Sequence, residues 1–221
     1  MLSPTTLKFL KDLKNNNEKT WFNAHRNSYE LARLDVHQLI EKILSTLSIK
    51  DTNLQHLLAK DCIFRIHKDA RFSKNAPPYK TNFGASLTKG GKKSGFAGYY
   101  LHIEPGKSFV GGGLYMPIAD TLKKVRQEID YHTEEFKKTI EANPFKKIYK
   151  HLDTQAFSLS TVPKGYNKHQ AGIEYIKLKS FVAAKPLTDE DITSPTLFKT
   201  IIQSFKALTP MITFLNRAIN T

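Results

Sequence analysis

The chain has 221 residues, with 34 Lys or Arg against 20 Asp or Glu, and carries a formal net charge of +14. Hydrophobic residues make up 40% and charged residues 24%, which is typical of a globular protein with a core and excludes a disordered or collagen-like chain. The single cysteine excludes intramolecular disulfides and paired-cysteine zinc sites, and no apolar run of eighteen residues predicts a membrane span. We therefore expect a cytoplasmic protein without membrane association.

Helices are predicted for the N-terminal part of the chain, over about residues 3–58. Ser3 is a good N-cap, Pro4 suits the first helical turn, and leucines recur three apart, which predicts a short helix over 3–14. A longer helical stretch is predicted over about 19–47, where apolar residues recur at helical spacing.

From residue 61 the hydrophobic pattern changes to a period of two, which predicts four strands. One face of the predicted sheet carries the apolar positions Cys62, Phe64, Ile66, Phe83, Ala85, Leu87, Tyr99, Leu101, Ile103, Val110 and Leu114. The opposite, polar face carries Arg65, His67, Asn82, Gly84, Ser86, Tyr100, His102, Glu104, Gly111 and Gly113. A Pro-Gly turn after Glu104 makes the last two of these four strands antiparallel neighbours.

The C-terminal part alternates between helical and strand-like patterns. Helices are predicted over about 117–131, 134–142 and 195–218, and weak alternation over 155–162 and 176–184 predicts further strands.

No internal repeat and no long linker divides the chain. We expect a single α+β domain over 1–221, in which an antiparallel-rich sheet is flanked by N-terminal and C-terminal helices. It consists of the N-terminal helices over about 3–58, a sheet core over about 61–115, and a helical and mixed part over about 117–221. Nothing in the sequence defines an oligomeric state.

Half of the excess charge lies in one short segment. Residues 60–93 hold nine Lys or Arg and two Asp, an excess of +7. We call residues 65–82 the basic arch, because Pro77 and Pro78 hold its middle extended. Its candidate ligand-binding residues are Arg65, Lys68, Arg71, Ser73, Lys74, Tyr79, Lys80 and Asn82. Forked guanidinium donors, ammonium charges and hydroxyl or amide groups suit phosphate. Alternatively, Asp69 pairs with an arginine and the other side chains are solvated.

A second cluster lies on the predicted polar face. Tyr100, His102 and Glu104 alternate along one strand, and Gly111 and Gly113 beside them offer a floor without side chains. This face also carries residues of the basic arch, so the two clusters can form one site. Alternatively, it is the solvated side of a half-covered sheet.

An enzymatic interpretation uses the same face. His102 or His67 acts as a general acid or base, oriented by Glu104 or Asp69. His67, His102 and Glu104 are also of the types that bind divalent metals, but any alternating strand places such residues on one face, so we expect no metal and no cofactor.

Lys164 and Tyr166 form a second small basic and aromatic group. We include both in the expected ligand-binding set. The alternative is a turn, because Pro163 and Gly165 are turn formers.

Three stretches carry a family resemblance: FRIHKDARFSKNAPPYKTNFGASL (64–87), GYYLHIEPGKSFVGGGLYMPIADTLKKVRQEI (98–129) and VPKGYNKHQ (162–170). Together they resemble the widespread family catalogued as domain of unknown function 2461, over nearly the full chain. The resemblance implies no activity, because the family's name assigns none. His67 stands where another polar residue is expected, a mild departure.

The sequence thus predicts a protein that binds an anionic ligand, either a phosphorylated small molecule or nucleic acid, through the basic arch and the polar face. Two alternatives stay open. One is an enzyme acting on a phosphorylated substrate, and the other is an interaction module for an acidic protein partner.

Overall fold

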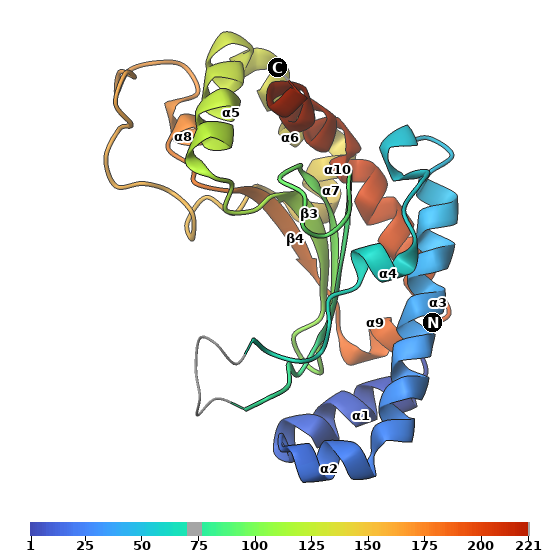
Figure 1. Cartoon of the computed structure of the whole chain (residues 1–221). Helices are drawn as coiled ribbons and strands as arrows, with labels where there is room; N and C mark the ends of the chain where they lie inside the picture. The colour runs from blue at the N-terminus through green and yellow to red at the C-terminus, as the bar shows by residue number, and fades with distance from the viewer. Residues whose placement is uncertain (70–76, 221) are drawn as a thin grey trace. The chain divides into compact units, whose positions relative to one another are not determined.

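The structure, a computed structural model, describes residues 1–69 and 77–220. It confirms the predicted α+β class, with a four-stranded antiparallel sheet in the order β1-β2-β3-β4 (Figure 1). The strands are β1 (Phe83–Thr88), β2 (Gly98–Ile103), β3 (Phe109–Leu114) and β4 (Phe181–Pro186).

Helices precede, separate and follow the strands, as predicted. In the described part of the chain they are α1 (Pro4–Asn15), α2 (Lys19–Ala24), α3 (Arg26–Leu47), the short 3-10 helix η1 (Thr52–Leu54), α4 (Ala59–Cys62), α5 (Ala119–Tyr131), α6 (Thr133–Glu141), α7 (Asn143–Tyr149), α8 (Ile173–Ile176), α9 (Asp189–Thr193) and α10 (Leu197–Asn220). The short helices α4, α7, α8 and α9 were not predicted, since a periodicity needs more than one or two turns to be visible.

The contacts within the chain define two compact units, each built from separate segments. The first comprises Met1–Lys92, Tyr100–Val110 and Pro186–Ile202, and the second comprises Lys93–Tyr99, Gly111–Lys185 and Gln203–Thr221. The organisation of the whole chain as one domain stays a prediction.

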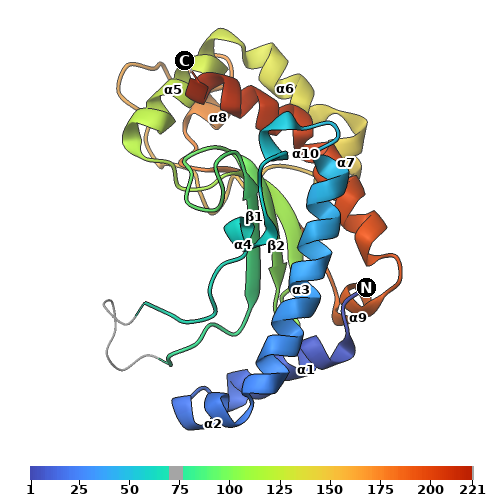
Figure 2. The same ribbon diagram turned by 45° about the vertical axis from the view of Figure 1, so that its right-hand side comes forward.

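In the first unit, α1 packs against α3 (Figure 2). Ser3 is the N-cap of α1, and its backbone N–H donates to the Asp35 carboxylate of α3 at 2.8 Å. The Thr6 hydroxyl donates to the same carboxylate oxygen at 2.6 Å. A single carboxylate therefore fixes the start of α1 on the longer helix.

The apolar side of β1 faces α3, which lies alongside it (Figure 2). Phe83, Ala85 and Leu87 are buried, as their alternation predicts, and the Tyr29 ring of α3 stacks on Phe83 with centroids 6.4 Å apart. Burial of each large apolar side chain contributes about 1.5–3 kcal/mol. The other face of β1 is thereby left for polar groups.

The strand predicted at the beginning of the sheet core is wrong. Residues 59–62 form α4, in which the Asp61 carboxylate accepts the backbone N–H of Leu58 at 3.2 Å. After it, in the part of this segment that the structure describes, isolated bridges join Ile63 to Ala85 and His67 to Tyr79. A helical turn that satisfies its own backbone groups leaves too few residues for a regular strand.

In the second unit, Phe136 of α6 lies at the centre of an aromatic core. Its ring centroid is 5.2 Å from Tyr175, 6.2 Å from Phe181 and 5.2 Å from Phe214. The strand predicted over 155–162 is wrong, because only Ser158 is bridged there. That predicted over 176–184 is partly confirmed, since β4 begins at Phe181.

Candidate functional site

The polar face of the first unit is organised around Glu104, which directly follows β2. The Nε2 of His102 lies 3.0 Å from one Glu104 carboxylate oxygen, and the Thr81 hydroxyl donates to the other at 3.0 Å. Both side chains are largely covered, with His102 17% and Glu104 18% exposed. Each carboxylate oxygen therefore has its own donor.

These contacts favour the charged form of the carboxylate. Burial raises the pKa of Glu104, but the hydrogen bonds from His102 and Thr81 outweigh it, and the net pKa is below its ordinary value. The predicted pairing of His102 with Glu104 is thus present in the structure.

The second ring nitrogen of His102 faces two further polar groups. Its Nδ1 is 3.4 Å from the Tyr100 hydroxyl and 3.4 Å from the Asn82 side-chain amide. In the tautomer that carries its proton on Nε2, the N–H donates a hydrogen bond to the Glu104 carboxylate and Nδ1 is an acceptor. The predicted sharing of one face by Asn82, Tyr100 and His102 is confirmed.

Aromatic rings surround this group, which the sequence reasoning missed. Phe109 stacks on His102 with centroids 4.9 Å apart and an interplanar angle of 11°, and it lies 5.6 Å from Tyr100. Phe64 lies 6.4 Å from Tyr100. Phe64 was assigned to the apolar face, which is wrong, because its segment is not a regular strand and alternation does not apply to it. None of these three rings is fully enclosed, because Phe64, Tyr100 and Phe109 are each half-buried.

One cation adjoins the aromatic rings, and a second cation lies near it. The Lys80 ammonium lies 5.4 Å from the centroid of Phe64, and burial together with the neighbouring Arg65 charge lowers its pKa. Arg65 is 69% exposed and lies 3.8 Å from the Asp69 carboxylate. Within residues 1–69 and 77–220, no carboxylate is within ion-pair distance of Lys80.

The two described arms of the basic arch pair with each other (Figure 1). The Lys68 N–H donates to the Pro78 carbonyl at 2.9 Å, and the Lys80 N–H donates to the Ile66 carbonyl at 2.7 Å. Asn17 holds the base of the arch, since its side chain exchanges two hydrogen bonds of 3.0 Å with the backbone of Tyr79. The predicted ligand residues Arg71, Ser73 and Lys74 lie outside the described residues.

His67 and Tyr79 lie against the aromatic core of the N-terminal helices. Tyr79 is 4% exposed and stacks on Phe22 with centroids 4.0 Å apart, and His67 lies 5.8 Å from the same ring. No three His, Cys, Asp or Glu side chains in the described chain are grouped to hold a metal ion. His67, His102 and Glu104 are therefore not brought together as one group of three.

The glycine floor expected beside the polar face is wrong. A Cβ on Gly111 or Gly113 would overlap a backbone carbonyl oxygen of β4, that of Ala183 or Phe181 respectively. These glycines let two strands approach closely, and the space above them is filled by backbone.

Lys164 and Tyr166 belong to the second unit. Burial and the Asp130 charge raise the pKa of Tyr166, while the Arg126 charge opposes them. Tyr166 thus lies close to charged groups of α5, and Lys164 is exposed. Their membership of the ligand-binding set stays a prediction.

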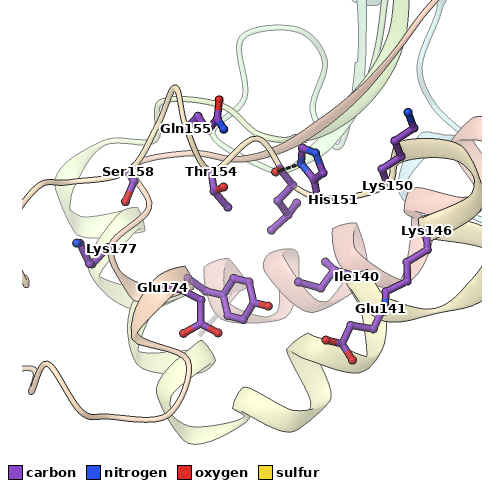
Figure 3. A pocket seen from close by; sticks show the side chains of 12 residues that line it. Ile140, Glu141, Lys146, Lys150, His151, Thr154, Gln155, Ser158, Glu174 and Lys177 are labelled. Atoms are coloured by element: carbon purple, nitrogen blue, oxygen red, sulfur yellow. Dashed lines mark hydrogen bonds between the residues drawn. The ribbon is translucent and has the colours of Figure 1, made fainter.

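The second unit also contains a cavity of about 480 Å³ that no sequence motif indicated (Figure 3). Lys146, Lys150 and Lys177 line it together with Glu141 and Glu174, so charges of both signs face the same space. Its residues come from separated segments, which is why no local pattern marks it. The mixed lining favours neither an anion nor a cation.

No helix in the described part of the chain has both the length and the apolar composition needed to cross a membrane. No curated protein and no solved structure matches the sequence. A family model described as "Conserved hypothetical protein (DUF2461)" matches residues 5–214, which include the basic arch and the polar face. This match over nearly the whole length confirms the resemblance carried by the three sequence stretches, and the chain belongs to the DUF2461 family.

Proposed function

We propose that the first unit binds a phosphate-bearing ligand at a surface formed by Arg65, Lys80, Asn82, Tyr100 and His102, which we call the anion site. The observation that carries the proposal is Lys80. Its ammonium is partly buried beside a second cation, and its pKa is lowered as a result.

This arrangement is electrostatically incomplete among the described residues. The partly buried Lys80 ammonium is opposed by the charge of Arg65, which is exposed and lies 3.8 Å from Asp69, whereas a bound anion would attract both cations. Glu104 does not supply the missing charge, because its carboxylate contacts His102 and Thr81 and does not contribute to the pKa shift of Lys80. Phosphate fits the available donors, since Arg65 offers a fork and Lys80 a point charge.

A neighbouring neutral group supports the same conclusion. The contact of Asn82 with His102 is long, at 3.4 Å, and such hydrogen bonds are weak. The Asn82 amide can therefore donate to a ligand oxygen at little cost.

The proposal is tested by isothermal titration of the protein with sodium tripolyphosphate at several salt concentrations. Lys80→Gln removes the ammonium and is expected to weaken binding about tenfold or more, which corresponds to about 1.4 kcal/mol or more. Lys199→Gln is the matched control, because it removes an exposed lysine elsewhere in the first unit. Equal affinities of the wild-type protein and Lys80→Gln contradict the proposal.

A second candidate function is proton transfer on a phosphate-bearing substrate. The observation that favours it is the orientation of His102, whose Nε2 is held by Glu104 while Nδ1 faces the anion site. A histidine held in this way can act as a general base, with an effect of about 10²–10⁴-fold on rate. If the wild-type protein hydrolyses bis-p-nitrophenyl phosphate, the rate should fall by that factor in His102→Gln. An unchanged rate in that variant contradicts the role.

A further inference from the structure

We propose that the ligand of the anion site is single-stranded nucleic acid, with bases that stack on the rings of Phe64, Tyr100 and Phe109. We call these three rings the aromatic row. The inference rests on the proposed function, because the same site must first bind phosphate.

The aromatic row is continuous. Phe64 and Tyr100 have ring centroids 6.4 Å apart, and Tyr100 and Phe109 have centroids 5.6 Å apart. Each of the three side chains is half-buried, so each is held by the fold and still reaches the surface. Gly84 maintains this arrangement, since a Cβ at its position would lie 2.6 Å from the Tyr100 hydroxyl oxygen.

Half-exposed rings beside cations are the combination that binds single strands. Each base stacked on an aromatic side chain contributes about 1–3 kcal/mol, largely without regard to sequence, and basic groups follow the phosphates. In this protein the Lys80 ammonium lies 5.4 Å from the centroid of the Phe64 ring. The cation and the stacking surface are thus adjacent.

The distribution of charge complements a polyanion better than a single phosphate. The described cations Arg65, Lys68 and Lys80 come from the two paired arms of the basic arch, and Arg65 and Lys68 are exposed. A strand carries a phosphate at every nucleotide, so several such charges can be used together.

The number of rings favours a strand over a mononucleotide or a duplex. A mononucleotide has one base and needs one stacking surface, whereas three adjacent rings offer several stacking surfaces. In a duplex the faces of the bases are stacked on one another and are not available to a protein surface. A single strand leaves its bases free to stack on side chains.

The experiment separates stacking from phosphate binding. Fluorescence anisotropy compares a labelled oligothymidylate of about twelve nucleotides with an abasic oligomer of the same length, which keeps the phosphates and lacks the bases. The oligothymidylate is expected to bind about tenfold tighter or more. An oligouridylate and a duplex of the same length, with thymidine monophosphate as competitor, complete the set of probes.

Variants test the row itself. Phe64→Leu and Phe109→Leu each remove a ring and keep an apolar side chain, and each is expected to lower affinity for oligothymidylate about fivefold or more without changing binding of the abasic oligomer. Phe198→Leu is the matched control, because Phe198 is a half-buried aromatic residue in α10 whose ring lies under Lys42. Circular dichroism and thermal midpoints establish that each variant folds. If one of the two row variants does not fold, the other still tests the aromatic row.

The outcomes are distinguishable. Equal, salt-sensitive binding of the oligothymidylate and the abasic oligomer overturns stacking and leaves the anion site intact. Binding of neither oligomer, together with no binding of tripolyphosphate, overturns both proposals. Thymidine monophosphate binding as tightly as the oligothymidylate, or tighter binding of the duplex, overturns the single strand as the ligand.

Discussion

Replacing Glu104 by Gln tests the hydrogen-bond network on which the polar face depends. The carboxylate accepts one bond from His102 and one from Thr81, each at 3.0 Å. The amide of Gln can keep both contacts, because its oxygen accepts from His102 and its NH₂ group donates to the Thr81 hydroxyl oxygen. What the substitution removes is the negative charge of the acceptor.

The expected loss of stability follows from that difference. A hydrogen bond to a charged group contributes about 1.5–3 kcal/mol and a neutral one about 0.5–1.5 kcal/mol. With two bonds affected, the free energy of unfolding should fall by about 2 kcal/mol at neutral pH. Glu18→Gln is the control, since Glu18 is exposed and makes no side-chain capping bond, so that its change should stay within about 0.5 kcal/mol.

The dependence on pH gives an independent readout. The folded-state pKa of Glu104 lies below its ordinary value, so its contribution is complete above the pKa of the unfolded chain, about 4.3. The contribution is lost as the pH falls through the lowered folded-state pKa. The difference between the wild-type protein and Glu104→Gln should therefore shrink in acid.

Urea unfolding at pH 7 and at about pH 3 measures both quantities, and two-dimensional NMR of the His102 ring nitrogens reports which one carries the proton. We expect the proton on Nε2 in the wild-type protein. The reasoning is refuted by a variant as stable as the wild type at pH 7, by a stability difference that does not change with pH, or by a ring whose only proton is on Nδ1.

Three further predictions concern the fold. Gly113→Ala should lower the free energy of unfolding in urea by more than about 3 kcal/mol, because Gly113 has a φ of +122° and the added Cβ would overlap backbone atoms. The control Gly106→Ala, at a φ of +73° in open space, should lower it by about 1 kcal/mol. Similar losses in the two variants contradict the steric argument. Asn17→Ala should speed amide exchange of Tyr79 about tenfold, because it removes the Asn17 side-chain contacts to the Tyr79 backbone; an unchanged rate means that the arch is held otherwise. Cys62 is 0% exposed, and burial raises the pKa of its thiol to about 11. Near neutral pH, iodoacetamide should therefore label Cys62 only when the protein unfolds. Rapid labelling of the folded protein contradicts this prediction.

The sequence by itself determined the class of the fold and the two sides of its regular strands. Where a strand forms, side chains alternate between faces, so the pattern over Phe83–Leu87 and Tyr99–Ile103 correctly separated the buried residues from Tyr100 and His102. The same rule failed at Phe64, because α4 and isolated bridges replace the strand that the period of two predicted.

Only the tertiary structure decided how the polar residues are partnered. Thr81 and Glu104 are 23 positions apart, and Asn82 and His102 are 20 apart, so no local pattern could pair them. The close approach of β3 to β4, which uses the space beside Gly113, likewise joins distant segments. Periodicity depends on the local backbone, whereas hydrogen bonds, ring contacts and charge pairing depend on which side chains the complete fold brings within a few ångströms.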